Sequence, residues 1–374
     1  MDPPGKSPPR PGTLGRDPAP GRGPDGSLPD GFRIAAPAVS LPKGGGAIAG
    51  MGEKVRAIPV TGSASVGIPL PLTPGRGGFT PALSLSYDSG AGNGPFGLGW
   101  RLSLPSIRRK TDRGLPRYRD DIDVFVLSDA EDLVPIPGAT RLDGGVDGEY
   151  AVARYRPRVE GGFARIERWT RRADGRVHWR TTSRDNVRRT YGLGEGARLV
   201  DPDDPRRVFE WLLEEERDER GNVVVYSYAS EDRLGVGSSP AERHRGTPGN
   251  GVAYRYPKQV SWGNTVDGAF RLHLVFDYGD HDQVDPGLEP DRPWPARPDA
   301  FSWFRAGFDV RCHRLCRRIL LFHAFETVRP TPFVVRSVAL TYDERPTVST
   351  LASAQTVGWR WTGTAYEQAS LPAL

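Results

Sequence analysis

The strongest constraint on the fold is a run of alternating apolar residues that starts at residue 66. Two sets of same-parity apolar residues stand on either side of a turn: Val66, Ile68, Leu70 and Leu72 before it, and Phe79, Leu83, Leu85 and Tyr87 after it. Alternation with a period of two is typical of a strand with one buried face. The segment 73–78, TPGRGG, favours a turn, because proline fixes φ and glycine permits positive φ. The stretch therefore predicts a β-hairpin, and the strand-like segment 100–104 predicts a third strand.

The rest of the chain repeats this pattern of short strands and turns. Further strands are predicted at 124–127, 133–136, 151–156, 163–170, 177–181, 187–191, 208–213, 223–228, 252–256, 259–262, 270–278, 334–342 and 356–361. Two segments leave a helix open: 212–220 is rich in helix formers, and 310–325 is strongly apolar, although its β-branched and aromatic residues favour a strand. No alternation of strands with helices is present, so the sequence predicts an all-β fold of many short antiparallel strands and hairpins.

Composition supports this class and divides the chain in two. The 374 residues include Gly 46 and Pro 36, and both residue types are unfavourable inside helices. Residues 1–40 are rich in Pro, Gly and Asp with almost no aromatic side chains, so they cannot bury enough surface to offset the entropy lost on ordering. We expect residues 1–40 to be a disordered tail and residues 41–374 to form the β domain, with long loops at 229–251 and 281–298.

Charge and the N-terminus argue against two classes of protein. Lys and Arg number 51 against 46 Asp and Glu, and the two signs are interleaved, whereas a nucleic-acid-binding protein more often gathers its basic residues on one face. The first residues, MDPPGKSPPRPG, lack the apolar core of a Sec signal peptide, and no apolar run is long enough for a transmembrane helix. We therefore expect no nucleic-acid partner, no membrane span and, for an exported protein, a route other than Sec.

A glycine-rich segment matches a nucleotide-binding motif in letters only. Residues 92–97, GNGPFG, fit G-x-G-x-x-G. That motif holds a pyrophosphate where a helix begins behind it, whereas here Pro95 interrupts the motif and the strand-like segment 100–105 follows. We interpret the segment as a tight turn packed against neighbouring backbone, and we predict no cofactor and no cofactor-binding residue.

Possible metal ligands do not form a complete pattern. Asp120, Asp121 and Asp123 lack the spacing and the glycine of an EF-hand and are more simply a solvated turn. The histidines are scattered and contain no H-E-x-x-H motif: His178, His244, His273, His281, His313 and His323. The segment 312–316 offers two cysteines and one histidine without a fourth ligand, which favours buried or half-buried thiols in a strand over a zinc site.

Signals for catalysis are equally incomplete. Glu214, Glu215 and Glu216 contain the E-x-E pair that ADP-ribosyltransferases use. The Ser-Thr-Ser-like strand that should precede the pair is absent, since 349–351 comes after it, and like charges before a Gly-Asn turn are more simply a solvated corner. No G-x-S-x-G nucleophile turn is present. We predict no catalytic residue, no metal-binding residue and no enzyme activity for this chain.

Several long segments resemble one bacterial toxin family. They are LPKGGGAIAGMGEK, IPVTGSASVGIPL, TPGRGGFTPALSLSYDSGAGNGPFGLGW, LSLPSIRRKTDRGLPRY, DVFVLSDAEDLVP, WLLEEERDERGNVVVYSY and DAFSWFRAGFDVRCHRLCRRILLFHAF, and the likeness ends near SLPAL. These segments are similar to the SpvB-type N-terminal domain, which is shared by the Salmonella virulence-plasmid B protein and the B component of insecticidal toxin complexes. The resemblance covers almost everything after the predicted tail.

The resemblance implies a function that the residues alone do not. It implies a non-enzymatic structural module of a secreted bacterial toxin, in which a curved, shell-like β-sheet encloses or delivers a toxic polypeptide. The implied partners are an RHS-containing C component and a pore-forming A component. The implied location is extracellular, after synthesis in the cytoplasm. The alternative is the delivery half of an ADP-ribosylating virulence protein whose catalytic domain lies outside this chain.

Two further expectations concern the extent of the module. The sequence shows no propeller and no long RHS array, so we expect either a fragment or a short gene product that acts with other chains. In both cases we expect part of a shell with an exposed, unpaired strand edge near the C-terminus. A third interpretation is a self-contained carbohydrate- or surface-binding module, for which Trp294 and Trp303 are the candidate exposed residues.

Overall fold

The computed structural model of the chain describes residues 54–58, 63–128, 131–145, 147–245 and 251–374. All of these residues belong to the unit Ile48–Leu374. The predicted tail at residues 1–40 and the predicted domain boundary at residue 41 lie outside the described residues, so both stay predictions. No helix in the described part of the chain is long and apolar enough to cross a membrane.

The hairpin predicted around residue 75 is confirmed within a four-stranded sheet. Its strands follow chain order: β1 (Lys54–Ile58), β2 (Ser63–Pro69), β3 (Ser84–Asp88) and β4 (Trp100–Leu102). Strands β2 and β3 pair antiparallel with Val66 opposite Tyr87, and β4 is the predicted third strand. The strands are shorter than the alternation suggests, because Leu70, Leu72 and Phe79 lie beyond the strand ends. The short helical turn η2 (Arg76–Gly78) stands where the sequence predicts the turn.

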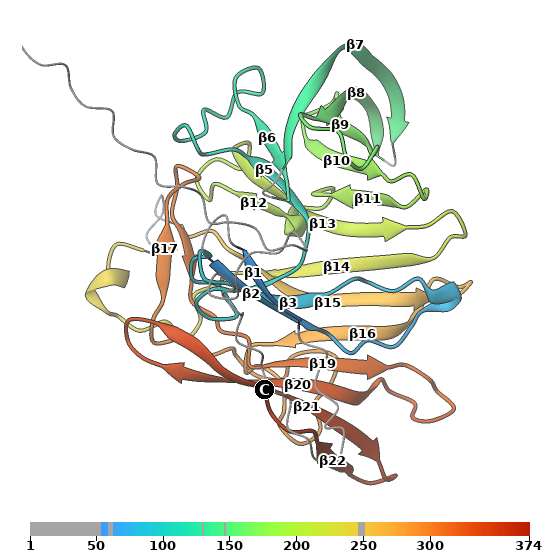
Figure 1. The fold of residues 1–374 in the computed structure, drawn as a ribbon, viewed down its shortest axis with the longest axis vertical. Coiled ribbons are helices and arrows are strands. Elements are labelled where there is room, and N and C mark those ends of the chain that lie inside the picture. Colours follow the sequence, from blue (N-terminus) through green and yellow to red (C-terminus); the bar gives the residue numbers. More distant parts are fainter. Residues whose placement is uncertain (1–53, 59–62, 129–130, 146, 246–250) are drawn as a thin grey trace, which may run out of the picture. The chain divides into compact units, whose positions relative to one another are not determined.

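A second sheet closes on itself (Figure 1). Eight of its strands form a ring, each paired antiparallel with the next: β5 (Ser106–Arg109), β6 (Phe125–Leu127), β7 (Glu131–Gly145), β8 (Gly148–Pro157), β9 (Arg165–Arg171), β10 (Val177–Thr182), β11 (Arg188–Tyr191) and β13 (Val208–Arg217). The ring closes because β13 pairs with both β5 and β11. The short helical turn η3 (Glu195–Ala197) separates β11 from β12 (Arg198–Val200), which also pairs with β13. We call the ring the closed sheet.

The same β13 begins an open antiparallel extension that runs through the lower half of Figure 1. Its strands, in spatial order, are β14 (Val223–Ser230), β15 (Arg255–Asn264), β16 (Phe270–Asp277), β19 (Arg318–His323), β20 (Phe333–Glu344), β21 (Ser349–Trp361) and β22 (Tyr366–Ser370). We call it the open sheet. A separate pair contains β17 (Phe301–Trp303) and β18 (Val310–Cys312), and the helical turn η4 (Pro240–Glu242) lies in the long loop before β15.

The predicted all-β class is confirmed, and the described residues contain no α-helix. The helix left open for 212–220 is wrong, because β13 continues through Arg217. The segment 310–325 forms β18 and β19 with a connection between them, and the two strands predicted at 252–262 are the single strand β15. The predicted unpaired edge is present within the described residues, where β22 pairs with β21 alone.

Aromatic rings fill the interior of the closed sheet. Phe125 on β6 contacts Tyr155 on β8, Trp179 on β10 and Trp211 on β13, with ring centroids 6.1, 5.0 and 5.8 Å apart. Since β6 pairs only with β5 and β7 among the described strands, these contacts cross the interior rather than run along one sheet face. Edge-to-face rings of this kind add to the stabilisation from burial alone, by about 0.5–1.5 kcal/mol per pair.

The four-stranded sheet and its turn pack on the open sheet. Leu70 and Leu85 are buried in the same apolar cluster as Leu274 and Leu321. The indole of Trp262 on β15 donates a hydrogen bond to the backbone oxygen of Thr73 at 3.0 Å. The alternating apolar residues in and beside β2 and β3 therefore cover the face of the open sheet that carries Leu274 and Leu321.

Candidate functional site

The glycine-rich turn between β3 and β4 is held by a buried ion pair from the second half of the chain. Arg297 donates hydrogen bonds to the backbone oxygen of Gly94 at 2.7 Å and to the side-chain oxygen of Asn93 at 3.1 Å. The guanidinium also pairs with both carboxylate oxygens of Asp299, at 2.8 and 2.7 Å. Neither side chain of this pair is exposed to solvent. Ser349 completes the arrangement, because its backbone N–H and its hydroxyl each donate to Asp299 at 2.6 Å.

Electrostatics keep this pair charged. Burial alone would raise the pKa of Asp299, but hydrogen bonds from Arg297 and Ser349 outweigh burial and hold that pKa below its ordinary value. Gly97 has a φ of 87°, and a Cβ atom there would lie 3.0 Å from the backbone oxygen of Ser349. The interpretation of this segment as a tight turn against neighbouring backbone is therefore confirmed, and strand β4, not a helix, follows it.

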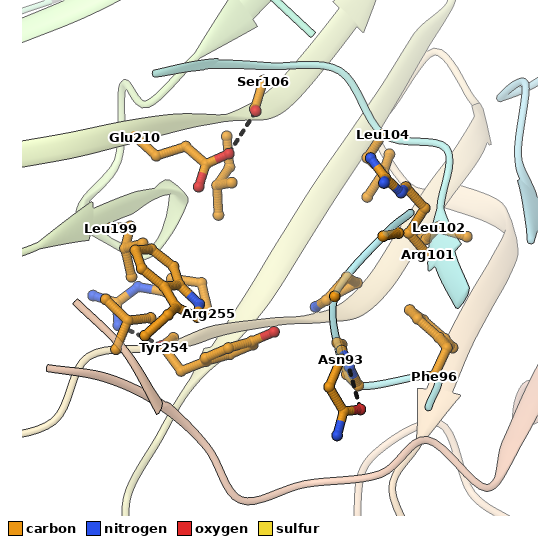
Figure 2. Close-up of a pocket in the computed structure, with 18 of the residues that line it drawn as sticks. Asn93, Phe96, Arg101, Leu102, Leu104, Ser106, Leu199, Glu210, Tyr254 and Arg255 are labelled. Atoms are coloured by element: carbon orange, nitrogen blue, oxygen red, sulfur yellow. Dashed lines mark hydrogen bonds between the residues drawn. The ribbon is translucent and has the colours of Figure 1, made fainter. Parts of the chain in front are cut away.

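A cavity of about 680 Å³ opens beside this turn (Figure 2). Residues of the four-stranded sheet, the closed sheet, the open sheet and the pair β17–β18 line it. Six aromatic residues line it: Phe96, Trp100, Tyr228, Tyr254, Phe301 and Trp303. Figure 2 shows Glu210, Tyr254 and Arg255 on one side of the cavity and Asn93, Arg101 and Leu102 on the other. The volume is in the range of small-molecule sites, which are typically concave, mostly apolar and fitted with a few polar groups.

The charged groups of the cavity are unequal in number and in environment. Arg101, Arg255 and Arg305 line it together with a single acidic residue, Glu210. Glu210 accepts a hydrogen bond from the Ser106 hydroxyl at 2.5 Å. One Nη of Arg255 donates to the backbone oxygen of Tyr254 at 3.1 Å, while its Nε has no hydrogen-bond partner among the described residues. Burial, and then the charge of Arg198, lower the pKa of Arg255.

These lining groups combine apolar walls with a few polar and charged side chains, as is typical of a binding site. The described residues that line the cavity include no histidine, cysteine or lysine. Burial raises the pKa of the Tyr254 phenol well above its ordinary value, so that hydroxyl stays protonated and can only donate or accept hydrogen bonds.

The acidic segment 120–123 is partly what the sequence predicts. Asp121 is exposed and pairs with Arg119 at 2.6 Å, as expected for a solvated turn. For Asp123 the prediction of a solvated turn is wrong, because its side chain is only 7% exposed and binds Arg109 at 2.7 Å. Asp120 binds the same Arg109 at 2.8 Å. These carboxylates neutralise a buried guanidinium whose central carbon lies 5.1 Å from the centroid of the Phe125 ring.

Cys312 and Cys316 are buried free thiols, as predicted, although only Cys312 lies in a strand. Their sulfur atoms donate to backbone oxygens two residues ahead, each at 3.4 Å, and burial raises both thiol pKa values. His313 turns elsewhere and lies between Glu231 and Glu242, at 3.4 and 3.3 Å. Among the described residues no group of three or more His, Cys, Asp or Glu is arranged to hold a metal ion.

The Glu214–Glu216 triplet is not the solvated corner that the sequence predicts. All three residues lie within β13, and the corner follows at 218–222. Glu214 accepts from the backbone N–H of Gly194 at 2.8 Å, and Glu216 accepts from the Tyr226 hydroxyl at 2.6 Å. The prediction was wrong because the charged run continues strand β13, where Glu214 and Glu216 bind neighbouring segments and Glu215 pairs with Arg217 on the same strand.

Neither of the two tryptophans predicted to be exposed is exposed. Trp294 is 7% exposed, and its indole donates to Asp232 at 2.9 Å beneath the guanidinium of Arg314. Trp303 is half-buried and lines the cavity. The sequence did not reveal the remaining cavity residues, because 199–212, 254–257 and 301–310 are far apart along the chain and line the cavity together only in the folded structure. The pattern Tyr-Arg-Tyr at 254–256 is the one local feature that could have indicated an aromatic and basic binding site.

The chain is similar in sequence to proteins of one known family. Residues 58–325 match the family model described as Salmonella virulence plasmid 65kDa B protein. The mono(ADP-ribosyl)transferase SpvB of Salmonella choleraesuis (strain SC-B67) is 35% identical over 353 residues, covering 87% of this chain and 57% of the relative. The enzyme of the same name from Salmonella dublin is 35% identical over 352 residues, covering 86% and 57%. The chain thus spans little more than half the length of these relatives.

Solved structures agree with the sequence comparison. The N-terminal domain of effector protein SpvB from Salmonella typhimurium strain LT2 aligns with a TM-score of 0.72 and 34% identity, covering 78% of this chain and 99% of that one. The TcdB2-TccC3 crystal structure aligns with a TM-score of 0.79 and 34% identity, covering 91% and 17%. The Photorhabdus luminescens Tc holotoxin pore gives the same values. The resemblance inferred from the sequence is confirmed, and the chain belongs to the SpvB family, with the β fold of its N-terminal domain.

Proposed function

We propose that this chain is a non-enzymatic structural module of a secreted bacterial toxin, forming part of a β-shell that encloses or delivers a toxic polypeptide. The observation that carries the proposal is the alignment of 91% of the chain with 17% of the TcdB2-TccC3 chain at a TM-score of 0.79. A module that occupies a fraction of a much larger β assembly is expected to act through its surfaces and edges.

The architecture supports a role in a larger sheet. Strand β22 has one neighbour among the described strands, and its residues are mostly exposed. Backbone hydrogen bonds between Leu374 and Ala354, at 3.0 and 3.3 Å, continue this outer row past the end of β22. An outer strand with unpaired N–H and C=O groups is a template for pairing with another strand. The proposed partners are an RHS-containing C component and a pore-forming A component.

Co-assembly tests this proposal. The chain is produced together with an RHS-containing chain from the same genome, and the mixture is analysed by size-exclusion chromatography with light scattering. We expect a complex in which the C-terminal region of the RHS chain resists added protease, while the RHS chain alone is digested. Separate elution of the two chains, together with equal digestion in both samples, would contradict the shell function.

A second candidate function rests on the names of the curated relatives, which are mono(ADP-ribosyl)transferases. In that case the chain is the delivery half of an ADP-ribosylating virulence protein, and the catalytic domain belongs to sequence beyond it. Reading the genomic frame around this sequence separates the two candidates. A transferase domain on the same polypeptide supports the second, and an RHS array supports the first.

The proposed site of action is outside the producing cell, after synthesis in the cytoplasm. Export is tested by immunodetection in culture supernatant with and without azide, which inhibits the Sec translocase. Release that azide leaves unchanged supports the route other than Sec, and release that azide blocks would contradict it.

A further inference from the structure

We propose that the cavity beside the glycine-rich turn binds a small organic anion that carries an aromatic or other planar apolar body. The inference goes beyond the proposed shell function and does not depend on it. It rests on the cavity's size, its aromatic walls and the imbalance of its charged groups.

Size and lining define the apolar part of the ligand. About 680 Å³ is enough for a compact organic molecule and too little for a folded domain. The aromatic residues come from separate elements: Trp100 from β4, Tyr228 from β14, and Phe301 and Trp303 from β17. Aromatic side chains on several sides favour a planar ligand, because aromatic rings are stabilised by offset-stacked or edge-to-face contacts.

Charge defines the polar part of the ligand. Three arginines face one glutamate, and that glutamate already accepts the Ser106 hydroxyl. Among the described residues no carboxylate pairs with the exposed Arg101 or with the half-buried Arg255. Other half-buried arginines, such as Arg189 and Arg245, do have a carboxylate partner. Arg305 lies over the ring of Trp303, with 4.6 Å between its guanidinium carbon and the ring centroid. The guanidinium groups of Arg101 and Arg255, which have no carboxylate partner among the described residues, are ready donors to a carboxylate, sulfonate or phosphate.

Arg255 makes the strongest case for an incoming anion. Its Nε is buried and lacks an acceptor among the described residues, and leaving such a donor unpaired is unfavourable. Its side chain faces the cavity beside Tyr254 (Figure 2). An anionic group bound there would supply the missing acceptor and offset the repulsion from Arg198, which helps to lower the pKa of Arg255.

The proposal is tested with a matched pair of fluorescent probes on the whole chain. Anilinonaphthalene sulfonate carries an aromatic body and a negative charge, and phenylnaphthylamine is its uncharged analogue. We expect saturable binding of the sulfonate at one site per chain. The double substitution Arg101→Gln and Arg255→Gln should weaken binding of the sulfonate by roughly tenfold or more. It should weaken binding of the uncharged analogue by less than about twofold, since only the sulfonate accepts charge-assisted hydrogen bonds.

Two further variants keep the result interpretable. Arg154→Gln removes an exposed arginine of β8 outside the cavity lining and should leave both probes unchanged. Gly92→Leu should abolish binding of both probes while the unfolding midpoint stays near that of the wild type. Gly92 lines the cavity, its φ is outside the left-handed region, and a Cβ there meets no atom within 4 Å, so a larger side chain at its rim meets no clash at the Cβ.

Clear outcomes overturn the proposal. No saturable sulfonate binding would exclude the site, and undiminished binding to Gly92→Leu would place the probe elsewhere. Equal weakening of both probes by the arginine substitutions, or no weakening of either, would exclude an anion as the ligand. If the double variant does not fold, Arg101→Gln alone decides the matter, because Arg101 is exposed and its removal disturbs no buried contact.

Discussion

At the scale of single residues, buried arginines join segments that are far apart in the sequence. Arg297 connects the turn at Asn93 to Asp299 and, through it, to Ser349. Arg318 similarly binds Asp277 at 2.6 Å. A buried charge is costly unless it is paired and hydrogen-bonded, so each arginine favours the one arrangement that supplies all of its partners.

The pair Arg297–Asp299 gives the first prediction. Asp299→Ala leaves a fully buried guanidinium without its counter-charge and removes the acceptor for Ser349. We expect the free energy of unfolding to fall by about 3–5 kcal/mol, as is usual when one member of a buried pair is removed. Urea unfolding monitored by tryptophan fluorescence measures the change. The control is Asp343→Ala, which breaks a pair with Arg345 whose side chains are 51% and 68% exposed and should cost less than about 1 kcal/mol. Equal losses in both variants would contradict the role of the buried pair.

Two glycines of the same turn give the second prediction. Gly99 has a φ of 79°, and a Cβ there would lie 2.5 Å from the ring of Tyr87. Gly99→Ala should therefore lower the free energy of unfolding by roughly 2 kcal/mol or more, from backbone strain together with the clash. Gly92→Ala meets no atom and should stay within about 1 kcal/mol of the wild type. Thermal and urea unfolding of the two variants compare them, and equal stabilities would show that glycine is not required by the geometry at residue 99.

At the scale of elements, β13 holds the two parts of the large sheet together. Its first half pairs with β5 and β12, and its second half pairs with β11 and β14. One strand therefore belongs to the closed sheet and starts the open sheet. The polar residues near its end remain in strand geometry because neighbours on both edges satisfy their backbone.

This difference between a central and an outer strand gives the third prediction. β13 has partners on both edges, whereas β22 pairs only with β21 within the described residues and is largely exposed. Backbone amides of 366–370 should exchange with deuterium at least roughly tenfold faster than those of 208–217, since strands with little buried surface open locally at low free energy. Peptide-level hydrogen exchange with mass detection measures both segments in one sample. Equal protection would mean that the outer edge is covered in solution.

Local patterns in the sequence predicted some elements well and others not at all. The hairpin β2–β3 and the strands β8 to β11 were predictable, because apolar alternation and Gly-containing corners act within a few residues. Strands β12 and β17 have three residues each, too few to show a period, and β22 (YEQAS) is too polar to show a buried face. The cavity and its charge imbalance depend on which distant strands pair, which no short window of sequence contains.

At the scale of the whole molecule, buried neutral histidines connect stability to pH. His178 is 3% exposed, lies against the rings of Tyr150 and Trp169, and has no partner for its Nε2 among the described residues. Burial, and then the charge of Arg180, lower its pKa to about 3. Burial likewise lowers the pKa values of His273, His281 and His323. Each of these groups prefers to be neutral in the folded chain.

The sign of the effect follows from proton uptake. Below about pH 6.5 an unfolded histidine binds a proton, whereas folded His178 stays neutral until about pH 3, so the folded state loses stability as the pH falls. From one such histidine the loss by pH 5 is about 2 kcal/mol. Burial would raise the pKa of Glu231, but hydrogen bonds from His313 and Arg314 hold it at about 2, so its stabilisation is lost only below about pH 4.5. The interval from pH 7.5 to pH 5 therefore isolates the histidines.

The fourth prediction uses this interval. His178→Gln should reduce the difference in unfolding free energy between pH 7.5 and pH 5 by about 2 kcal/mol relative to the wild type, because glutamine takes up no proton in the unfolded chain. Urea unfolding at the two pH values gives the difference. Tyr150→Phe is the control, since it removes a hydroxyl from the same cluster without adding or removing a group that titrates in this interval when unfolded. It should lower stability equally at both pH values. If His178→Gln keeps the wild-type difference, folded His178 is protonated near pH 6 and cannot be closed off among these rings.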